Sequence, residues 1–179
     1  MGLPTAAVLA SRGYDVHGVD VNPKAVETIN SGKAHIVEPD LDLLVRAAVQ
    51  TGKLKAHTTP AAADIFVVCV PTPFKGAHEP DLSYVEAATR LICPFLEPGN
   101  LVVLESTSPP GTTEMMAGIV ARERGNTLSE VYFAHAPERV LPGKVLREIV
   151  ENDRIIGGID DASTRKCVEF YSTFVTGEI

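Results

Sequence analysis

The chain has no long hydrophobic run and no cluster of basic residues, and both absences exclude classes of protein. Its longest uninterrupted apolar stretch, residues 65–70, is far too short to cross a bilayer. The N-terminus also lacks the basic start and apolar core of a signal peptide. The formal net charge is −7, whereas non-specific nucleic-acid binding needs clustered Lys and Arg. We therefore expect neither a membrane nor a nucleic acid among the partners.

Cysteine is also scarce, because only Cys69, Cys93 and Cys167 are present and their spacing does not suit a metal site. All three lie in apolar strand or helix patterns, which is typical of reduced thiols that pack as small hydrophobes. Reduced thiols indicate a cytoplasmic protein. The acidic segment after His78 lacks metal-ligand spacing too, so we predict no metal, and a loop that ends in a helix cap at Asp81.

What the sequence does contain is an alternation of short apolar strands with amphipathic helices. At 179 residues the chain suits one ordinary domain. The predicted strands cover residues 16–21, 65–70, 101–104, 131–134 and 154–156; the predicted helices end near residue 12 or cover residues 23–31, 41–52, 82–96, 113–124 and 162–174, with Asn22 and Asp40 as N-caps. This alternation favours an α/β fold, a doubly wound parallel sheet of Rossmann-like type.

The first residues contain only one of the three glycines of the dinucleotide-binding motif that they resemble. In a dinucleotide-binding unit, a strand runs into G-x-G-x-x-G, and the last glycine lets the next helix pack closely. Gly2, followed by Leu3 and Pro4, matches the end of that motif without its beginning. We therefore expect residues 1–179 to be a cofactor-binding domain truncated at its N-terminus and lacking its first strand.

Asp20 ends a predicted strand 18 residues after Gly2. In this fold an acidic side chain at that place meets the ribose hydroxyls of NAD and repels the extra phosphate of NADP. The alternatives are an ordinary strand-end carboxylate or an N-cap for the helix that begins at Pro23. Position alone leaves these nearly balanced, and Gly2 with the surrounding pattern favours the cofactor role.

Polar segments follow the later predicted strands at their carboxyl ends, where open α/β sheets bind ligands. Residues 71–74 and 105–113 are rich in Thr, Ser and Pro, which also suits plain turns. In residues 137–143, Arg139 is suited to clamp a sugar pyrophosphate and Glu138 to orient a water or carbonyl group. The alternative is a surface Glu138–Arg139 pair of little energetic value, and spacing does not decide between them.

Several of these strings, taken in order, resemble the UDP-sugar 6-dehydrogenases of the UDP-glucose/GDP-mannose dehydrogenase family. The matching strings are Gly2-Leu3-Pro4-Thr5-Ala6, Gly18-Val19-Asp20-Val21-Asn22, Ile36-Val37-Glu38-Pro39, Val70-Pro71-Thr72-Pro73, Glu105-Ser106-Thr107-Ser108-Pro109, Pro137-Glu138-Arg139-Val140-Leu141-Pro142-Gly143 and Asn152-Asp153-Arg154-Ile155-Ile156-Gly157-Gly158. The resemblance covers essentially the whole chain, and the ordered set is far more specific than any one string.

The resemblance implies NAD-dependent oxidation of a UDP-sugar C6 alcohol to a carboxylate, in two hydride transfers, for polysaccharide biosynthesis. It assigns NAD contacts to Gly2, Asp20, Thr72, and Thr107 or Thr113; substrate contacts to Arg139 and Val140; and hydration chemistry to Glu138. Relatives that act on UDP-glucose tend to carry a second Glu in place of Pro142. Its absence favours a 2-acetamido sugar, UDP-N-acetyl-D-mannosamine before UDP-N-acetylglucosamine, and UDP-glucose is the remaining alternative.

The family's nucleophilic Cys and catalytic Lys have no counterpart in this sequence, since they belong to a helical linker and substrate domain that we expect to be absent. The full-length form is expected to be a homo-oligomer through that helical region. The competing hypothesis is a non-catalytic nucleotide-binding module or an inactive remnant. Either way, we predict no measurable oxidation by residues 1–179 alone.

Overall fold

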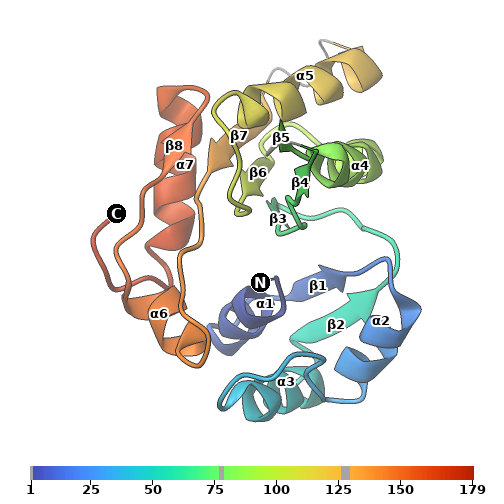
Figure 1. The fold of residues 1–179 in the computed structure, drawn as a ribbon, viewed down its shortest axis with the longest axis vertical. Coiled ribbons are helices and arrows are strands. Elements are labelled where there is room, and N and C mark those ends of the chain that lie inside the picture. The colour runs from blue at the N-terminus through green and yellow to red at the C-terminus, as the bar shows by residue number, and fades with distance from the viewer. Residues whose placement is uncertain (1, 77–78, 126–129) are drawn as a thin grey trace. The chain divides into compact units, whose positions relative to one another are not determined.

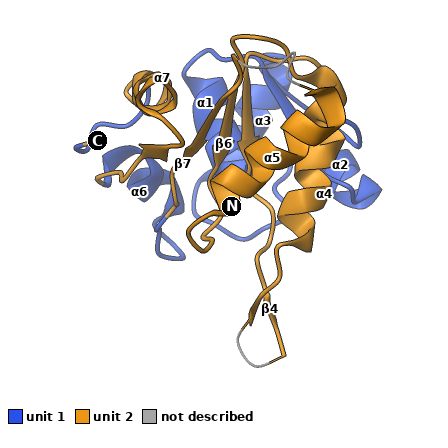
Figure 2. Cartoon of the chain, turned by 90° about the horizontal axis from the view of Figure 1, so that it is seen from above, with its two compact units in different colours: residues 1–61, 139–152, 174–178 blue, residues 62–138, 153–173, 179 orange. Residues whose placement is uncertain are grey.

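The computed structural model describes residues 2–76, 79–125 and 130–179. The chain forms two compact units, each built from more than one stretch of sequence (Figure 2). Unit 1 comprises residues 1–61, 139–152 and 174–178, and unit 2 comprises residues 62–138, 153–173 and 179. His78, which begins the acidic segment for which we predict no metal, lies outside the described residues.

Unit 1 combines a two-stranded parallel sheet with helices. Its elements are α1 (Gly2–Ser11), β1 (Val16–Val19), α2 (Pro23–Asn30), α3 (Leu41–Gln50), β2 (Leu54–His57) and α6 (Val145–Glu151). β1 and β2 run parallel, with Val16 opposite Leu54 and Val19 opposite His57 (Figure 1). The buried core joins the apolar sides of α1, α3 and β2. Leu146 of α6 packs against this core, so the second stretch of the unit, residues 139–152, is anchored to the first.

Unit 2 is built on a four-stranded sheet in the order β3-β6-β7-β8. Its elements are β3 (Ile65–Val68), β4 (Phe74–Lys75), β5 (Glu79–Pro80), α4 (Ser83–Ile92), the 3-10 helix η1 (Cys93–Phe95), β6 (Leu101–Leu104), α5 (Thr112–Arg124), β7 (Tyr132–His135), β8 (Gly157–Gly158) and α7 (Asp161–Tyr171). β3, β6 and β7 are mutually parallel, whereas β8 is antiparallel to β7.

Helices cover both faces of this sheet. Val102 and Leu104 of β6 belong to the core cluster that includes residues of α4 and α5. Leu101 and Val103 are also fully buried, and alternate residues of a strand point to opposite faces. Since α7 contacts β6, β7 and β8, it covers the second face. The predicted α/β class with a parallel sheet is thus confirmed, and cover on both faces is clearest for β6.

The predicted helix caps have mixed outcomes. Asn22 caps α2 as predicted, because its side chain accepts a hydrogen bond from Lys24 N. Asp40 occupies the N-cap position of α3 as predicted, but its side chain makes no capping hydrogen bond. Its backbone is left-handed, with φ 61°, whereas a capping residue normally has extended dihedrals. Asp81 accepts from Ser83 N over 2.9 Å, although Leu82 occupies the N-cap position of α4.

Other differences concern short elements. Residues 154–156 were predicted as a strand, but the strand is β8, at Gly157–Gly158. The predicted loop at residues 71–81 contains the β4–β5 ladder, which Figure 2 shows projecting from unit 2. β2 and α6 are not among the predicted elements. β1 and β3 also end two residues earlier than predicted, at Val19 and Val68.

Within the described ranges, no helix combines the length and apolarity needed to span a membrane. The same residues contain no group of His, Cys, Asp or Glu arranged to hold a metal ion. Cys69, Cys93 and Cys167 are all free thiols, and Cys93 and Cys167 are buried.

Candidate functional site

The carboxylate of Asp20 is held in a fixed position directly after β1. Its backbone N–H donates to His57 O over 3.1 Å, which extends the pairing of β1 with β2 by one residue. Its Oδ1 accepts from Asn22 N over 2.8 Å. The N-cap of α2 is Asn22, so the interpretation of Asp20 as that cap is wrong. A half-exposed carboxylate at a strand end fits a ribose diol, whose two hydroxyls need acceptors.

Gly2 begins α1, the helix that precedes β1. This agrees with the expected place of the last glycine in a dinucleotide motif. Leu3, Ala7 and Ala10 of the same helix enter the core of unit 1. The small side chains of α1 therefore fit a helix packed closely in its unit.

In unit 2, the loops that follow β3 and β6 are joined by two hydrogen bonds. Thr72 Oγ1 donates to Thr107 O over 2.7 Å, and Ser106 Oγ donates to Val70 O over 2.6 Å. The structure thus brings together two predicted NAD-contacting threonines from separate loops. Thr107 is exposed, whereas Thr113 lies in the first turn of α5 with 9% exposure. Of these two alternatives, Thr107 is the more accessible to a ligand.

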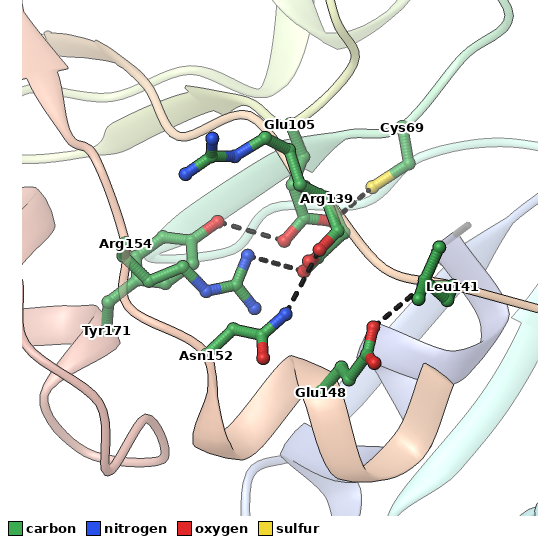
Figure 3. A network of polar contacts seen from close by, with 9 residues as sticks. Cys69, Glu105, Arg139, Leu141, Glu148, Asn152, Arg154 and Tyr171 are labelled. Atoms are coloured by element: carbon green, nitrogen blue, oxygen red, sulfur yellow. Dashed lines mark hydrogen bonds and ion pairs between the residues drawn. The ribbon is translucent and has the colours of Figure 1, made fainter. Parts of the chain in front are cut away.

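Glu105 is the centre of a buried polar network beneath these loops (Figure 3). Tyr171 donates its hydroxyl to Oε1 over 3.0 Å, and the Cys69 thiol donates to Oε2 over 3.1 Å. Burial, reinforced by the Glu105 carboxylate, raises the pKa of both Cys69 and Tyr171 well above their ordinary values. Both groups therefore stay protonated and keep their role as donors.

Glu138 forms an ion pair with Arg154 inside unit 2. Their side chains are only 3% and 2% exposed, respectively. The Arg154 guanidinium also lies over the Tyr171 ring, 5.6 Å from its centroid, in the range of a cation–π contact. The interpretation of Glu138 and Arg139 as a surface pair is wrong, since the partner is Arg154 and the pair is buried.

Arg139 and Val140, the predicted substrate contacts, belong to unit 1 and lie in an irregular segment before α6. Arg139 is exposed and Val140 is half-buried. Asn152 Nδ2 donates to Arg139 O over 3.1 Å, and Leu141 N donates to Glu148 Oε2 over 2.7 Å (Figure 3). These bonds fix the backbone of the segment. Neither of them involves the Arg139 guanidinium.

The hydrogen-bond and ion-pair partners of the predicted residues do not follow from the sequence. Glu105 belongs to a string that resembles the family but has no predicted role, and Tyr171 has none either. Arg154 was predicted to begin a strand, but it is buried, and a buried charge needs a partner. Which carboxylate provides that partner depends on tertiary packing, which the sequence alone does not show.

Comparison with known proteins gives the family. Residues 1–175 match the UDP-glucose/GDP-mannose dehydrogenase family, NAD binding domain. Two relatives are the UDP-N-acetyl-D-mannosamine dehydrogenase of Campylobacter jejuni, 54% identical, and the NDP-N-acetyl-D-galactosaminuronic acid dehydrogenase of Ralstonia nicotianae, 55% identical. The alignments cover 99% of this chain and 46% and 44% of those proteins.

The structural comparison agrees with the sequence comparison. The UDP-N-acetyl-mannosamine dehydrogenase Cap5O of Staphylococcus aureus superposes with a TM-score of 0.94 at 41% identity, over 99% of this chain and 44% of that one. The chain thus spans less than half the length of the relatives that it matches. The Rossmann-like fold and the NAD cofactor predicted from the sequence are confirmed. The chain belongs to the UDP-glucose/GDP-mannose dehydrogenase family and corresponds to its NAD-binding domain.

Proposed function

We propose that the chain is the NAD-binding part of an enzyme that oxidises the C6 alcohol of a UDP-2-acetamido sugar to a uronic acid, with UDP-N-acetyl-D-mannosamine as the substrate. The observation that carries the proposal is the match over 99% of the chain to relatives named for that activity. Pro142 supports the 2-acetamido sugar, because it occupies the place where UDP-glucose enzymes tend to carry Glu.

We propose that the cofactor contacts divide between strand-end groups. Asp20 accepts hydrogen bonds from the adenosine ribose, and its charge repels the additional phosphate of NADP. Thr72 and Thr107 supply hydroxyl and backbone groups at the carboxyl ends of β3 and β6, with Gly2 and Thr113 as the other predicted contacts. When bound, NAD takes up the hydride removed from the sugar carbon.

We propose that Arg139 and Val140 contact the UDP-sugar and that Glu138 assists hydration of the oxidised carbon. An exposed guanidinium matches a pyrophosphate with paired, charge-assisted hydrogen bonds. Glu138 pairs with Arg154, and we assign it the role of accepting hydrogen bonds and orienting water. The burial of this pair in unit 2 supports a defined position for the carboxylate.

Further parts of the proposal concern the cellular setting. Free thiols and a nucleotide-sugar substrate support a cytoplasmic enzyme of polysaccharide biosynthesis. The proposed full-length form is a homo-oligomer.

The test is a chimera in which residues 1–179 replace the aligned segment of the Campylobacter jejuni relative, with the rest of that protein kept on either side. NADH formation is measured with UDP-N-acetyl-D-mannosamine, UDP-N-acetyl-D-galactosamine, UDP-N-acetylglucosamine and UDP-glucose. We expect the highest kcat/KM with UDP-N-acetyl-D-mannosamine. A preference for another sugar would overturn the substrate assignment, and saturable NAD binding without turnover would favour a non-catalytic module.

A further inference from the structure

We propose that Glu38 is a positioning residue for the substrate-binding segment at residues 139–143. This inference rests on the proposed function, because it assigns Arg139 and Val140 to the UDP-sugar. Glu38 belongs to the Ile36-Val37-Glu38-Pro39 string, which resembles the family and has no proposed contact with NAD or the sugar.

The contact itself joins distant parts of unit 1. Gly143 N donates to both carboxylate oxygens of Glu38, at 2.9 Å to Oε2 and 3.2 Å to Oε1, across 105 residues of sequence. Gly143 has φ 85°, a left-handed conformation that favours glycine. A charged acceptor therefore holds the amide of the residue at which the segment turns toward α6.

Two more side chains hold the same segment, and the three contacts fall on every second residue. Asn152 binds the carbonyl of Arg139, Glu148 binds the amide of Leu141, and Glu38 binds the amide of Gly143. Glu148 and Asn152 lie in the first turn and at the C-cap of α6. Glu38, in contrast, lies in the loop before α3. Its contact therefore joins the segment to that loop.

The supports of these contacts are themselves anchored. Val145 and Ile149 of α6 are buried, and Leu146 packs against the core of unit 1. On the other side, Glu38 O accepts from Leu41 N, and Leu41 is fully buried at the start of α3. The 139–143 segment is therefore held between two anchored supports.

All three contacts bind backbone atoms rather than side chains. The backbone is fixed in advance, while Arg139 remains exposed and free to meet a ligand. Preorganisation of this kind improves affinity, because binding then costs less conformational entropy. Loss of the Glu38 contact should therefore weaken binding of the UDP-sugar and leave NAD binding unaffected, since Glu38 contacts none of the proposed NAD residues.

The experiment compares Glu38→Ala, Glu38→Gln and the control Glu27→Ala in the chimera. Glu27 is an exposed carboxylate of α2 in the same unit, so the control removes the same charge. For Glu38→Ala we expect KM for the UDP-sugar to rise about tenfold, as for loss of one hydrogen bond to a charged group. We expect kcat and KM for NAD to change by less than about twofold. Glu38→Gln retains an acceptor oxygen and should restore part of the affinity.

A second readout does not depend on turnover. Amide hydrogen exchange at residues 139–143 should become faster in Glu38→Ala and stay unchanged in Glu27→Ala. Unchanged exchange would overturn the positioning role, and faster exchange with an unchanged KM would overturn its link to the substrate. A parent chimera inactive on every UDP-sugar would instead contradict the proposed function, while the exchange data would still decide whether Glu38 holds the segment.

Discussion

Arg154 and Glu138 form an ion pair whose side chains are 2% and 3% exposed, and the guanidinium lies over the Tyr171 ring, 5.6 Å from its centroid. A buried charge that loses its partner cannot recover its hydration. Removal of one member of such a pair is therefore strongly destabilising, whereas replacement of both members by apolar residues is often nearly neutral.

We predict that Arg154→Met in the chimera lowers the free energy of unfolding by about 3–5 kcal/mol, as measured by urea denaturation. The double variant with Glu138→Leu should recover part of that loss, because no uncompensated charge remains. Arg147→Met is the control: its pair with Glu151 is exposed, and exposed pairs contribute little. An effect of Arg154→Met no larger than the control would show that the pair is not desolvated.

The specificity for NAD is expected to depend on Asp20. Asp20→Asn removes the negative charge but keeps the side-chain shape, so we expect KM for NAD to rise about tenfold and discrimination against NADP to fall. The kinetics of the chimera with each cofactor give both quantities. Asp15→Asn changes an exposed carboxylate in the same unit and should leave KM for NAD and the discrimination against NADP unchanged. Equal changes of these quantities in both variants would argue against ribose recognition by Asp20.

Gly158 and Gly157 offer a matched pair of substitutions in β8. A Cβ at Gly158 would lie 2.4 Å from Thr164 N and 2.8 Å from Asp160 O, both backbone atoms at the start of α7. A Cβ at Gly157 would meet nothing within 4 Å. We predict that Gly158→Ala costs at least about 1–3 kcal/mol, the range for overpacking, and that Gly157→Ala is much milder. Comparison of their thermal unfolding midpoints tests this, and equal midpoints would contradict the close contact.

The buried thiols predict loss of stability at alkaline pH. Burial raises the pKa of Cys93 to about 11 and that of Cys167 to about 12, from an ordinary value of 9.0. Above pH 9.0 the unfolded chain releases these protons while the folded chain retains them, so folded stability falls as pH rises. For Cys167 the loss should continue up to about pH 12.

Urea denaturation at a series of pH values measures this slope, and Cys167→Ala should reduce it. An identical slope in the variant would show that the Cys167 thiol does not titrate differently in the folded and unfolded states. Thiol labelling of the native protein near neutral pH should also be slow at Cys93 and Cys167, and fast after unfolding.

The sequence predicts elements best where the apolar pattern is continuous. Residues 101–104 were predicted as a strand and form β6 at those residues, because four consecutive apolar side chains suit a strand buried on both faces. β2 was missed because its sequence, LKAH, has weak strand propensity and is stabilised by pairing with β1. β8 consists of two glycines, so no side-chain pattern indicates it.

In the site, too, some contacts are predictable from the sequence and others are not. The meeting of Thr72 and Thr107 follows from parallel strands that end at one edge, and the structure confirms that these two loops are joined. The pairing of Glu138 with Arg154 and of Glu38 with Gly143 depends on how separate segments pack. The roles of the predicted cofactor and substrate contacts, and the expected truncation of the domain, stay predictions.

The two glycines of β8 also affect the tendency of the unit 2 sheet to pair with strands of other chains. β8 is the last strand of the sheet and pairs with β7 in the antiparallel sense over only two residues. A strand this short presents few backbone groups to another molecule, and very short edge strands protect against sheet-to-sheet association. β8, which no side-chain pattern indicates, thus limits aggregation along this edge of the sheet.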